Sequence, residues 1–393
     1  MAIALLIVGL ILFVGLVVIH EFGHFIVARR NGVKVEEFGL GFPPKAFGRK
    51  TKSGFIFSVN WLPLGGFVRL KGEHDADTKP GTFGAASTWV KTKIMAAGIF
   101  MNLLAAVVIF TILAWVGMPQ LVNNQFTVKS DTKVIKSEVL VGAVQSGSPA
   151  AKIGLQSRDM LVAIAPGSNP KDKDLLTKTN ADSLHDVTER YAGQTVVLTY
   201  ERGGQLKQSK VTLLSQKVVA ESQNSSNPKG YLGISPTEYT LQRSTWSAPI
   251  VALGVTKQLT VLTFQGLGSA IRGLGSLIAG LATQNKTARQ DGQKQATSEV
   301  SGPVGIFVIL KDGSSLGFQL MLMIVAVISL SLAIMNLLPI PALDGGKLFV
   351  TYVARLFHRR VSKQVEDWVY GLSFVFLLLL VGLITIVDVK RFF

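Results

Sequence analysis

Two histidines and a glutamate stand close together in an apolar segment, in the order His-Glu-Phe-Gly-His from residue 20 to residue 24. The surrounding run, residues 3–27, has no other charged residue and is long enough to cross a bilayer as a helix. On a helix, His20 and His24 share one face, so both imidazoles can bind one metal ion while Glu21 takes a proton from a water beside it. Ionisable groups are costly inside a membrane, and a zinc protease site would explain them. The alternative is that neighbouring helices satisfy these groups.

A catalytic zinc ion usually has three protein ligands and a water, so one ligand is still missing. The chain has no cysteine, and its other histidines lie in loops or in a long polar segment: His74, His185 and His358. The stretch 336–346, Asn-Leu-Leu-Pro-Ile-Pro-Ala-Leu-Asp-Gly-Gly, has prolines that break a helix and glycines that permit an irregular backbone. Such a backbone is tolerated near a membrane where it lines a cavity, which makes Asp344 the candidate third ligand. A solvated aspartate in a helix-terminating turn is the alternative.

The elements that must position these residues are apolar helices. The chain is 48% hydrophobic and 16% charged with a mean hydropathy of +0.40, which indicates an integral membrane protein. Four runs are candidate spans: 3–27, 94–117, 318–338 and 369–387. The connection 28–93 carries 12 Lys and Arg, and the connection between the last two spans is also basic, so both are expected in the cytoplasm.

Four spans with this orientation leave both termini and the segment 118–317 outside the cytosol. His20, His24 and Asp344 then lie at the same depth, near the cytoplasmic side, because the first and third spans both run inward. The net charge of +16 fits membrane anchoring. No stretch interleaves aromatic and basic residues as a nucleic-acid platform would, so nucleic acid is not an expected partner.

Both motifs together resemble those of the site-2 protease family of intramembrane zinc metalloproteases, in particular the bacterial single-PDZ regulators of sigma-factor signalling. In that family an H-E-x-x-H on the first helix and an N-x-x-P-x-P-x-L-D-G on the third bind zinc. The resemblance implies that His20, His24 and Asp344 are zinc ligands and that Glu21 is the catalytic base. It also implies that Asn336 holds the substrate backbone near the metal.

Two further stretches of the first half resemble the same family. Residues 39–42, Gly-Leu-Gly-Phe, resemble its short glycine-rich segment, and residues 55–70 resemble its re-entrant β-hairpin. The alternation in this second stretch and its glycine pair favour strands and a turn. The resemblance implies that Gly65, Gly66 and Phe67 bind substrate, because an edge strand can pair with an unwound substrate helix. A surface hairpin that packs on the helices is the alternative.

The segment expected outside the cytosol resembles a bacterial PDZ domain over residues 128–237. The resemblance rests on a strand at 141–144, a Ser-Pro-Ala helix start from residue 148 and a Gly-Leu turn followed by Asp159. One stretch is similar to the carboxylate-binding loop of these modules and is the tentative peptide site: Tyr231, Leu232, Gly233 and Ile234. An ordinary returning strand is the alternative. Residues 248–300 are expected to form a pair of interfacial helices and a linker, with a fifth span as the alternative.

The expected fold is therefore an α-helical membrane protein with four transmembrane helices, a re-entrant β-hairpin and an inserted extracytoplasmic α+β PDZ domain. Its parts are residues 1–117 with the first two spans, 128–237 with the PDZ domain, 248–300 with the interfacial helices, and 301–393 with the last two spans. By resemblance it lies in a bacterial cytoplasmic membrane.

The predicted function is that of a zinc endopeptidase that cleaves transmembrane segments of single-span membrane proteins, such as an anti-sigma factor or a remnant signal peptide, in regulated intramembrane proteolysis. An inactive PDZ scaffold would be expected to have lost Glu21 or Asp344, and both are present. A metal or proton transporter would also place His and Glu in the membrane, but no inverted repeat is evident.

Overall fold

The computed structural model describes residues 2–167, 174–176, 181–223, 228–283, 303–358 and 360–392. In this part of the chain, five helices are long and apolar enough to cross a membrane. They are α1 (Ala2–Arg30), α2 (Thr88–Val116), α6 (Ala248–Ala282), α9 (Phe318–Leu337) and α11 (Lys363–Phe392). Each of the four runs expected to span falls in one of these helices, to within one residue at its ends. The expectation of a protein with several membrane helices is therefore confirmed.

Helix α6 differs from the expectation for its stretch of sequence. Instead of a pair of helices, it is one continuous helix of 35 residues, and the window Ala248–Gly273 has the length and apolarity of a span. Its interior contains glycines but no proline, and a single glycine weakens a helix by only about 1 kcal/mol without breaking it. The linker expected to follow it, residues 284–300, lies outside the described residues.

Helix α2 lies at the centre of the helical part and packs against α1, α6 and α9. Its start is fixed by Ser87, whose side chain accepts a hydrogen bond from the backbone N–H of Val90. Farther along, Phe110 and Leu113 are fully buried in an apolar cluster with residues of α6 and α9. One helix thus contacts both halves of the sequence, which brings the segment around residue 20 close to the segment around residue 344.

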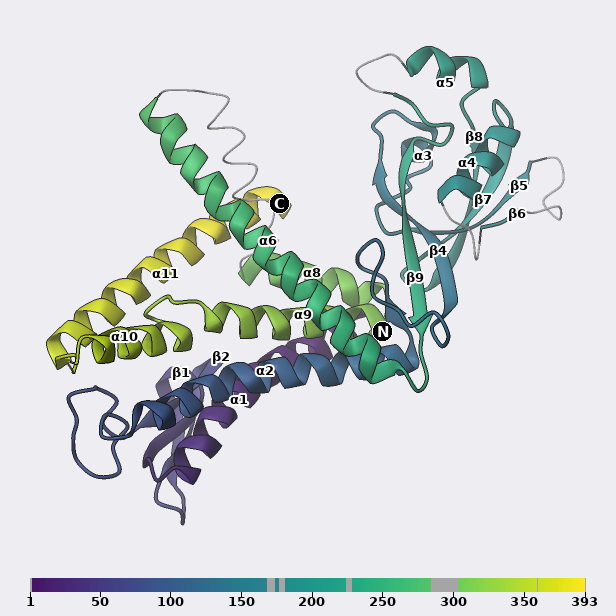
Figure 1. Ribbon diagram of the computed structural model, residues 1–393. Helices are drawn as coiled ribbons and strands as arrows, with labels where there is room; N and C mark the ends of the chain where they lie inside the picture. Colours follow the sequence, from purple (N-terminus) through teal and green to yellow (C-terminus); the bar gives the residue numbers. More distant parts are fainter. Residues whose placement is uncertain are drawn as a thin grey trace.

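The two ends of the helical part carry different structures (Figure 1). At one end lies a sheet of seven strands, inserted between α2 and α6, and the N-terminus lies at this same end. At the other end lie the β1–β2 sheet and the short helix α10 (Asp344–Leu356). A second short helix, α8 (Pro303–Ser315), packs on α1 and α11.

The expected hairpin of residues 55–70 has a different form. These residues make one strand, β2 (Ile56–Leu70), and its antiparallel partner is β1 (Val35–Lys50). The chain reverses at 51–55, where Thr51 and Phe55 are hydrogen-bonded. It reverses again between residues 60 and 66, because residues 56–59 run parallel to 37–40 whereas residues 66–69 run antiparallel to the same stretch. The reversal expected within residues 55–70 is therefore present, and the glycine pair 65–66 lies at its end. Both glycines are strand residues: Gly66 pairs with Leu40, and the stretch 37–40 pairs with both halves of β2.

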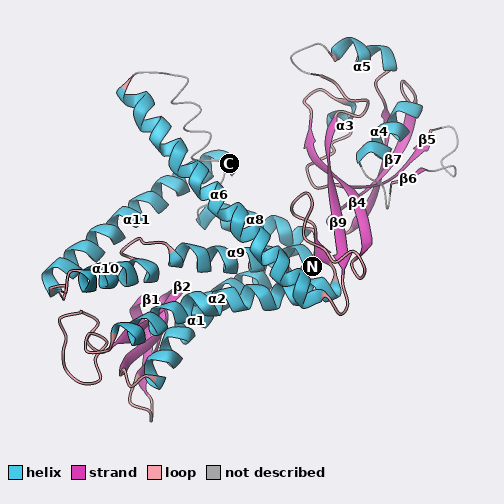
Figure 2. Cartoon of the chain, in the orientation of Figure 1, coloured by secondary structure: helices cyan, strands magenta, loops and turns pink. Residues whose placement is uncertain are grey.

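The seven-stranded sheet has the strand order β3-β9-β4-β5-β7-β8, with β6 paired to β5. Its strands are β3 (Met118–Pro119), β4 (Lys133–Val144), β5 (Met160–Pro166), β6 (Asp174–Leu175), β7 (Thr195–Arg202), β8 (Gln205–Thr212) and β9 (Ile234–Arg243). The sheet and three short helices enclose an apolar core of their own. Those helices are α3 (Pro149–Lys152), α4 (Ala181–Arg190) and α5 (Gln216–Ser222). Figure 2 shows this mixed α and β part beside the helical part.

Asp131 joins the sheet to the helices. Its carboxylate accepts hydrogen bonds from the backbone N–H and hydroxyl groups of Thr245 and Ser247, directly before α6, at 2.5 to 3.0 Å. Those hydroxyls, together with the two backbone N–H groups, hold the pKa of Asp131 well below its ordinary value. The two chain segments that connect the sheet with α2 and α6 are thus tied together at one point.

Candidate metal centre

His20 and His24 lie one turn apart on α1, and their imidazoles converge on one point. Their Nε2 atoms are 3.1 Å apart, and both residues are buried, with 8% and 5% of their surface exposed. Helical spacing alone produces this convergence, because residues i and i+4 share a face. Glu21 lies between them in sequence and lines the same cavity.

Asp344 approaches the two histidines from the other half of the chain. Its Oδ2 atom is 3.1 Å from Nε2 of His20 and 3.1 Å from Nε2 of His24. It is the first residue of α10, after the turn that ends α9. A side chain at Gly345 would collide with the backbone of residue 337, and one at Gly346 with that of residue 340, so this tight turn requires both glycines. The irregular backbone expected here therefore forms, and it holds Asp344 against α1.

Helix α2 contacts the two histidines of the metal-binding group. A Cβ atom at Gly98 would collide with Nε2 of His24, so only glycine leaves room for the imidazoles. Nδ1 of His24 is 2.7 Å from the carbonyl oxygen of Ile94, and Nδ1 of His20 is 3.3 Å from Nδ2 of Asn102. Sequence analysis did not find these residues. An asparagine in an apolar span, one turn after a glycine, was the signal that could have revealed them.

The three side chains fit a zinc ion by donor type and spacing. His20, His24 and Asp344 form a group of possible metal ligands, with ligand atoms within 4.8 Å of one another. Donors around a tetrahedral zinc, at about 2.0 to 2.1 Å from the metal, lie about 3.3 Å apart, close to the 3.1 Å measured here. Two imidazole nitrogens and a buried carboxylate oxygen, which has no hydrogen-bond partner among the described residues, are a set that a divalent cation would satisfy.

A cavity of about 810 Å³ opens from these residues. Its wall includes Glu21, Asn336, Phe67 and Lys347, together with the last residues of β2. The side-chain amide of Asn336 donates to the carbonyl oxygen of its own helix at residue 332, at 3.1 Å. Two of the predicted substrate-binding residues, Asn336 and Phe67, thus line the same cavity as the metal-binding group.

The other two predicted substrate-binding residues, Gly65 and Gly66, differ in their surroundings. A Cβ atom at Gly66 would lie 3.4 Å from Cγ of Glu21, so this backbone passes directly beside the glutamate. Gly65 has φ +93°, and a side chain there would collide with the ring of Phe42, away from the cavity. Gly66 is therefore next to the chemistry, whereas Gly65 shapes the strand.

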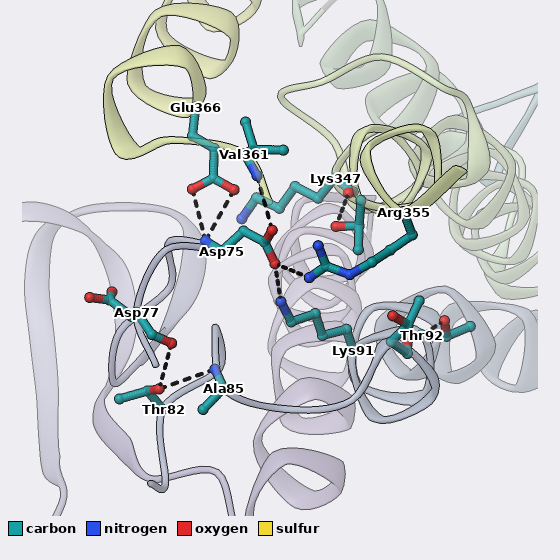
Figure 3. Close-up of polar contacts among 12 residues, drawn as sticks. Asp75, Asp77, Thr82, Ala85, Lys91, Thr92, Lys347, Arg355, Val361 and Glu366 are labelled. Carbon is teal, nitrogen blue, oxygen red and sulfur yellow. Dashed lines mark hydrogen bonds and ion pairs between the residues drawn. The ribbon is translucent and has the colours of Figure 1, made fainter. Parts of the chain in front are cut away.

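A buried polar cluster around Asp75 forms part of the cavity wall. Figure 3 shows the contacts of this cluster. The Asp75 carboxylate contacts Nζ of Lys91 at 2.5 Å and Nη2 of Arg355 at 2.6 Å, and it accepts from the N–H of Val361 at 3.1 Å. Its own N–H donates to the carboxylate of Glu366 at 3.0 Å. Burial alone would raise the pKa of Asp75, but the bonds from Lys91 and Arg355 lower it overall. The cluster ties the loop after β2 to α2, α10 and α11.

The residues predicted to bind a peptide lie in the sheet part, away from the metal-binding group. Tyr231 to Ile234 line a small cavity of about 90 Å³ beside α4, together with His185. The Tyr231 and Leu232 side chains are buried. The carbonyl oxygens of Tyr231, Leu232 and Gly233 accept backbone hydrogen bonds from within the same part.

Comparison with known proteins agrees with this arrangement. The sequence profile of "Peptidase family M50" matches residues 8–380. A protein of Clostridium acetobutylicum named "Putative zinc metalloprotease" is 31% identical over 393 residues, which cover 98% of this chain and 97% of the relative. The "Probable protease eep" of Enterococcus faecalis is 24% identical, with 98% of each chain covered. A "Putative zinc metalloprotease" of Helicobacter pylori strain J99 is 27% identical, with 98% of this chain and 99% of the relative covered.

Proposed function

The chain belongs to peptidase family M50, the site-2 protease family of membrane zinc metalloproteases, and from this premise we propose that it cuts transmembrane segments of single-span membrane proteins. The observation that carries the proposal is the convergence of His20, His24 and Asp344 at the wall of a cavity, with Glu21 beside them. The match to this family confirms the expected family and the expected zinc cofactor.

In the proposed site, His20, His24 and Asp344 bind the zinc ion, which when bound activates a water and polarises a peptide carbonyl. Glu21 takes a proton from the attacking water and returns it to the leaving amine. Gly98 leaves the space in which the two imidazoles converge, and the glycines after Asp344 permit the turn that brings its carboxylate to them. The burial of both histidines keeps bulk water away from the ligands.

A substrate helix must unwind before it can be cut, because its carbonyls are hydrogen-bonded and shielded. Residues 66–69 of β2 support this step. Among the described pairings they are bonded on one side, to residues 37–40, and Phe67 to Leu70 line the cavity with Glu21. The N–H of Leu70 already donates to the carboxylate of Glu73, at 2.9 Å. In our proposal this free edge pairs with the unwound substrate, and the amide of Asn336 turns from its own helix to the substrate backbone.

We further propose that residues 128–237, which lie within the sheet part, are an extracytoplasmic PDZ domain. Support comes from Ser148, which caps α3 as expected for the Ser-Pro-Ala helix start, and from α4 and the stretch 231–234, which line one cavity. In this proposal the N–H groups of that stretch receive a peptide carboxylate. Its position at the same end of the molecule as the N-terminus supports placing both outside the cytosol.

Topology is directly testable because the chain has no cysteine, so that single introduced cysteines report their own side of the membrane. We expect Ser225→Cys to react with an impermeant maleimide from outside and Thr51→Cys only after permeabilisation. A cysteine beyond the end of α6, at Thr283, reports whether α6 crosses the membrane. Labelling of Thr283→Cys from outside alone agrees with four spans, and labelling from inside requires a fifth.

Cleavage is tested in proteoliposomes with a tagged single-span substrate, and the products are located by mass spectrometry. We expect a cut inside the apolar segment, its loss with a zinc chelator and its recovery with added zinc. Cleavage confined to the soluble part of the substrate would contradict the proposal. The transport alternative predicts metal flux in the same liposomes without peptide hydrolysis.

A further inference from the structure

The two imidazoles of the metal-binding group each have a second nitrogen that faces α2. Nδ1 of His24 lies 2.7 Å from the carbonyl oxygen of Ile94. Nδ1 of His20 lies 3.3 Å from the side-chain nitrogen Nδ2 of Asn102. Asn102 is 1% exposed, and within the described residues its oxygen Oδ1 has no hydrogen-bond partner. A buried polar atom without a partner costs about 1 to 3 kcal/mol, so it requires an explanation.

The chemistry of a metal-bound imidazole supplies that explanation. A neutral ring carries one proton, and when Nε2 gives its lone pair to a metal, the proton must be on Nδ1. His24 satisfies this condition, because its Nδ1–H can donate to the carbonyl of Ile94. For His20, the Nδ1–H would face the NH₂ group of Asn102, so that two donors meet.

A rotation of the Asn102 amide by 180° turns this meeting of two donors into a hydrogen bond. It exchanges nitrogen and oxygen without moving the rest of the side chain, as such amides readily allow. Oδ1 then accepts the proton of His20 Nδ1 and is no longer without a partner. The backbone here is well fixed, because the buried hydroxyl of Ser329 on α9 donates to the Asn102 carbonyl at 2.8 Å.

We propose that Asn102 is a positioning residue of the metal centre: its side-chain oxygen accepts the Nδ1 proton of His20 and thereby directs the Nε2 lone pair toward zinc. This inference rests on the ligand set of the proposed function. Under this proposal the two histidine ligands of α1 are oriented in the same way, because the ring of each faces an oxygen of α2. One of these oxygens belongs to a backbone carbonyl and the other to a side chain. Partners of this kind set the tautomer and orientation of a ligand and strengthen metal binding.

The test is the zinc affinity of the purified full-length chain in detergent, measured by competition with a chelator. Asn102→Leu keeps the shape but removes the acceptor, and we expect its affinity to fall by about 10- to 100-fold. Asn102→Asp keeps an oxygen that can only accept, and we expect an affinity within about threefold of wild type. Thr111→Val, which removes a hydroxyl of the same helix that donates to the carbonyl oxygen of Val107 at 2.8 Å, is the matched control and should bind zinc as wild type does.

Thermal unfolding of the metal-free proteins separates this role from a loss of folding, and Asn102→Ala replaces the leucine variant if that protein does not fold. Unchanged affinity in the folded leucine or alanine variant would overturn the proposal. Equal losses in the aspartate and leucine variants would also overturn it, because packing and not an acceptor would then matter. His20→Ala distinguishes a failure of the role proposed for Asn102 from a failure of the proposed ligand set. If this variant binds zinc as tightly as wild type, the ligand set itself is wrong.

Discussion

The buried contact between Asp75 and Lys91 allows a quantitative prediction for the variant Asp75→Asn. The two side chains are 3% and 1% exposed, so solvent does little to screen the 2.5 Å contact between them. Loss of one partner leaves the other charge buried and uncompensated, which typically costs about 3 to 5 kcal/mol. The contact with Arg355 adds less, because that side chain is 29% exposed. We therefore expect the free energy of unfolding to fall by about 3 to 5 kcal/mol at pH 7.

The assay is equilibrium unfolding in mixed dodecyl-maltoside and SDS micelles, followed by circular dichroism. Asp77→Asn is the matched control, because Asp77 lies in the same loop, is 45% exposed and contacts His74 only at 3.8 Å. We expect that control to change the free energy of unfolding by no more than about 0.5 kcal/mol. A double-mutant cycle with Lys91→Met isolates the pair, and we expect a coupling energy of at least about 2 kcal/mol. If Asp75→Asn and Asp77→Asn cost the same, the reasoning from burial is refuted.

The contribution of Asp75 also has a defined pH dependence. Its pKa is lowered in the folded protein, so the stabilisation is fully present above the unfolded value of about 3.9. It is lost as the pH falls below this value and through the lower folded pKa. The stability difference between wild type and Asp75→Asn should therefore be constant from pH 5 to pH 8 and shrink below about pH 4. A difference that grows on acidification would contradict the assigned sign.

Two further predictions concern the metal centre and the junction of the two parts. Gly98→Ala should lower zinc affinity by at least about tenfold, because the added methyl collides with His24. The control Gly371→Ala, where the Cβ meets open space, should leave zinc affinity unchanged. Equal affinities of the two variants would show that the imidazoles can move aside. At the junction, the pKa of Asp131 is held below its ordinary value, so the contact with Ser247 should persist above about pH 4 and weaken in more acidic solution. The protection factor of the Ser247 amide, which is its exchange rate relative to the intrinsic rate at the same pH, should fall in more acidic solution in wild type and be low at every pH in Asp131→Ala.

The sequence was sufficient to predict the four apolar runs that lie in α1, α2, α9 and α11, and the shared face of His20 and His24. Apolar runs of span length carry a strong signal, and the spacing of His20 and His24 determines a shared helical face. The link to Asp344 came from a recognised motif together with the argument on depth. The measured distances of 3.1 Å agree with it.

The features that sequence reasoning missed depend on contacts between distant segments. Gly98 and Asn102 lie against the histidines of α1, and the local signal of an asparagine in an apolar span does not tell which side chains it contacts. The strand pairing was incomplete for a similar reason. Residues 37–40 lie between the two halves of β2 and pair with both of them, and the alternation within residues 55–70 does not reveal this separate stretch of sequence.

The central claim, that His20, His24 and Asp344 bind zinc and Glu21 acts as the base, is tested most directly by one paired measurement. Zinc content and cleavage of a single-span substrate are determined for wild type, Glu21→Gln and Asp344→Ala. The account predicts about one zinc per chain in wild type and Glu21→Gln, less in Asp344→Ala, and cleavage by wild type alone. Cleavage by Glu21→Gln at the wild-type rate, or full zinc content in Asp344→Ala, would contradict it.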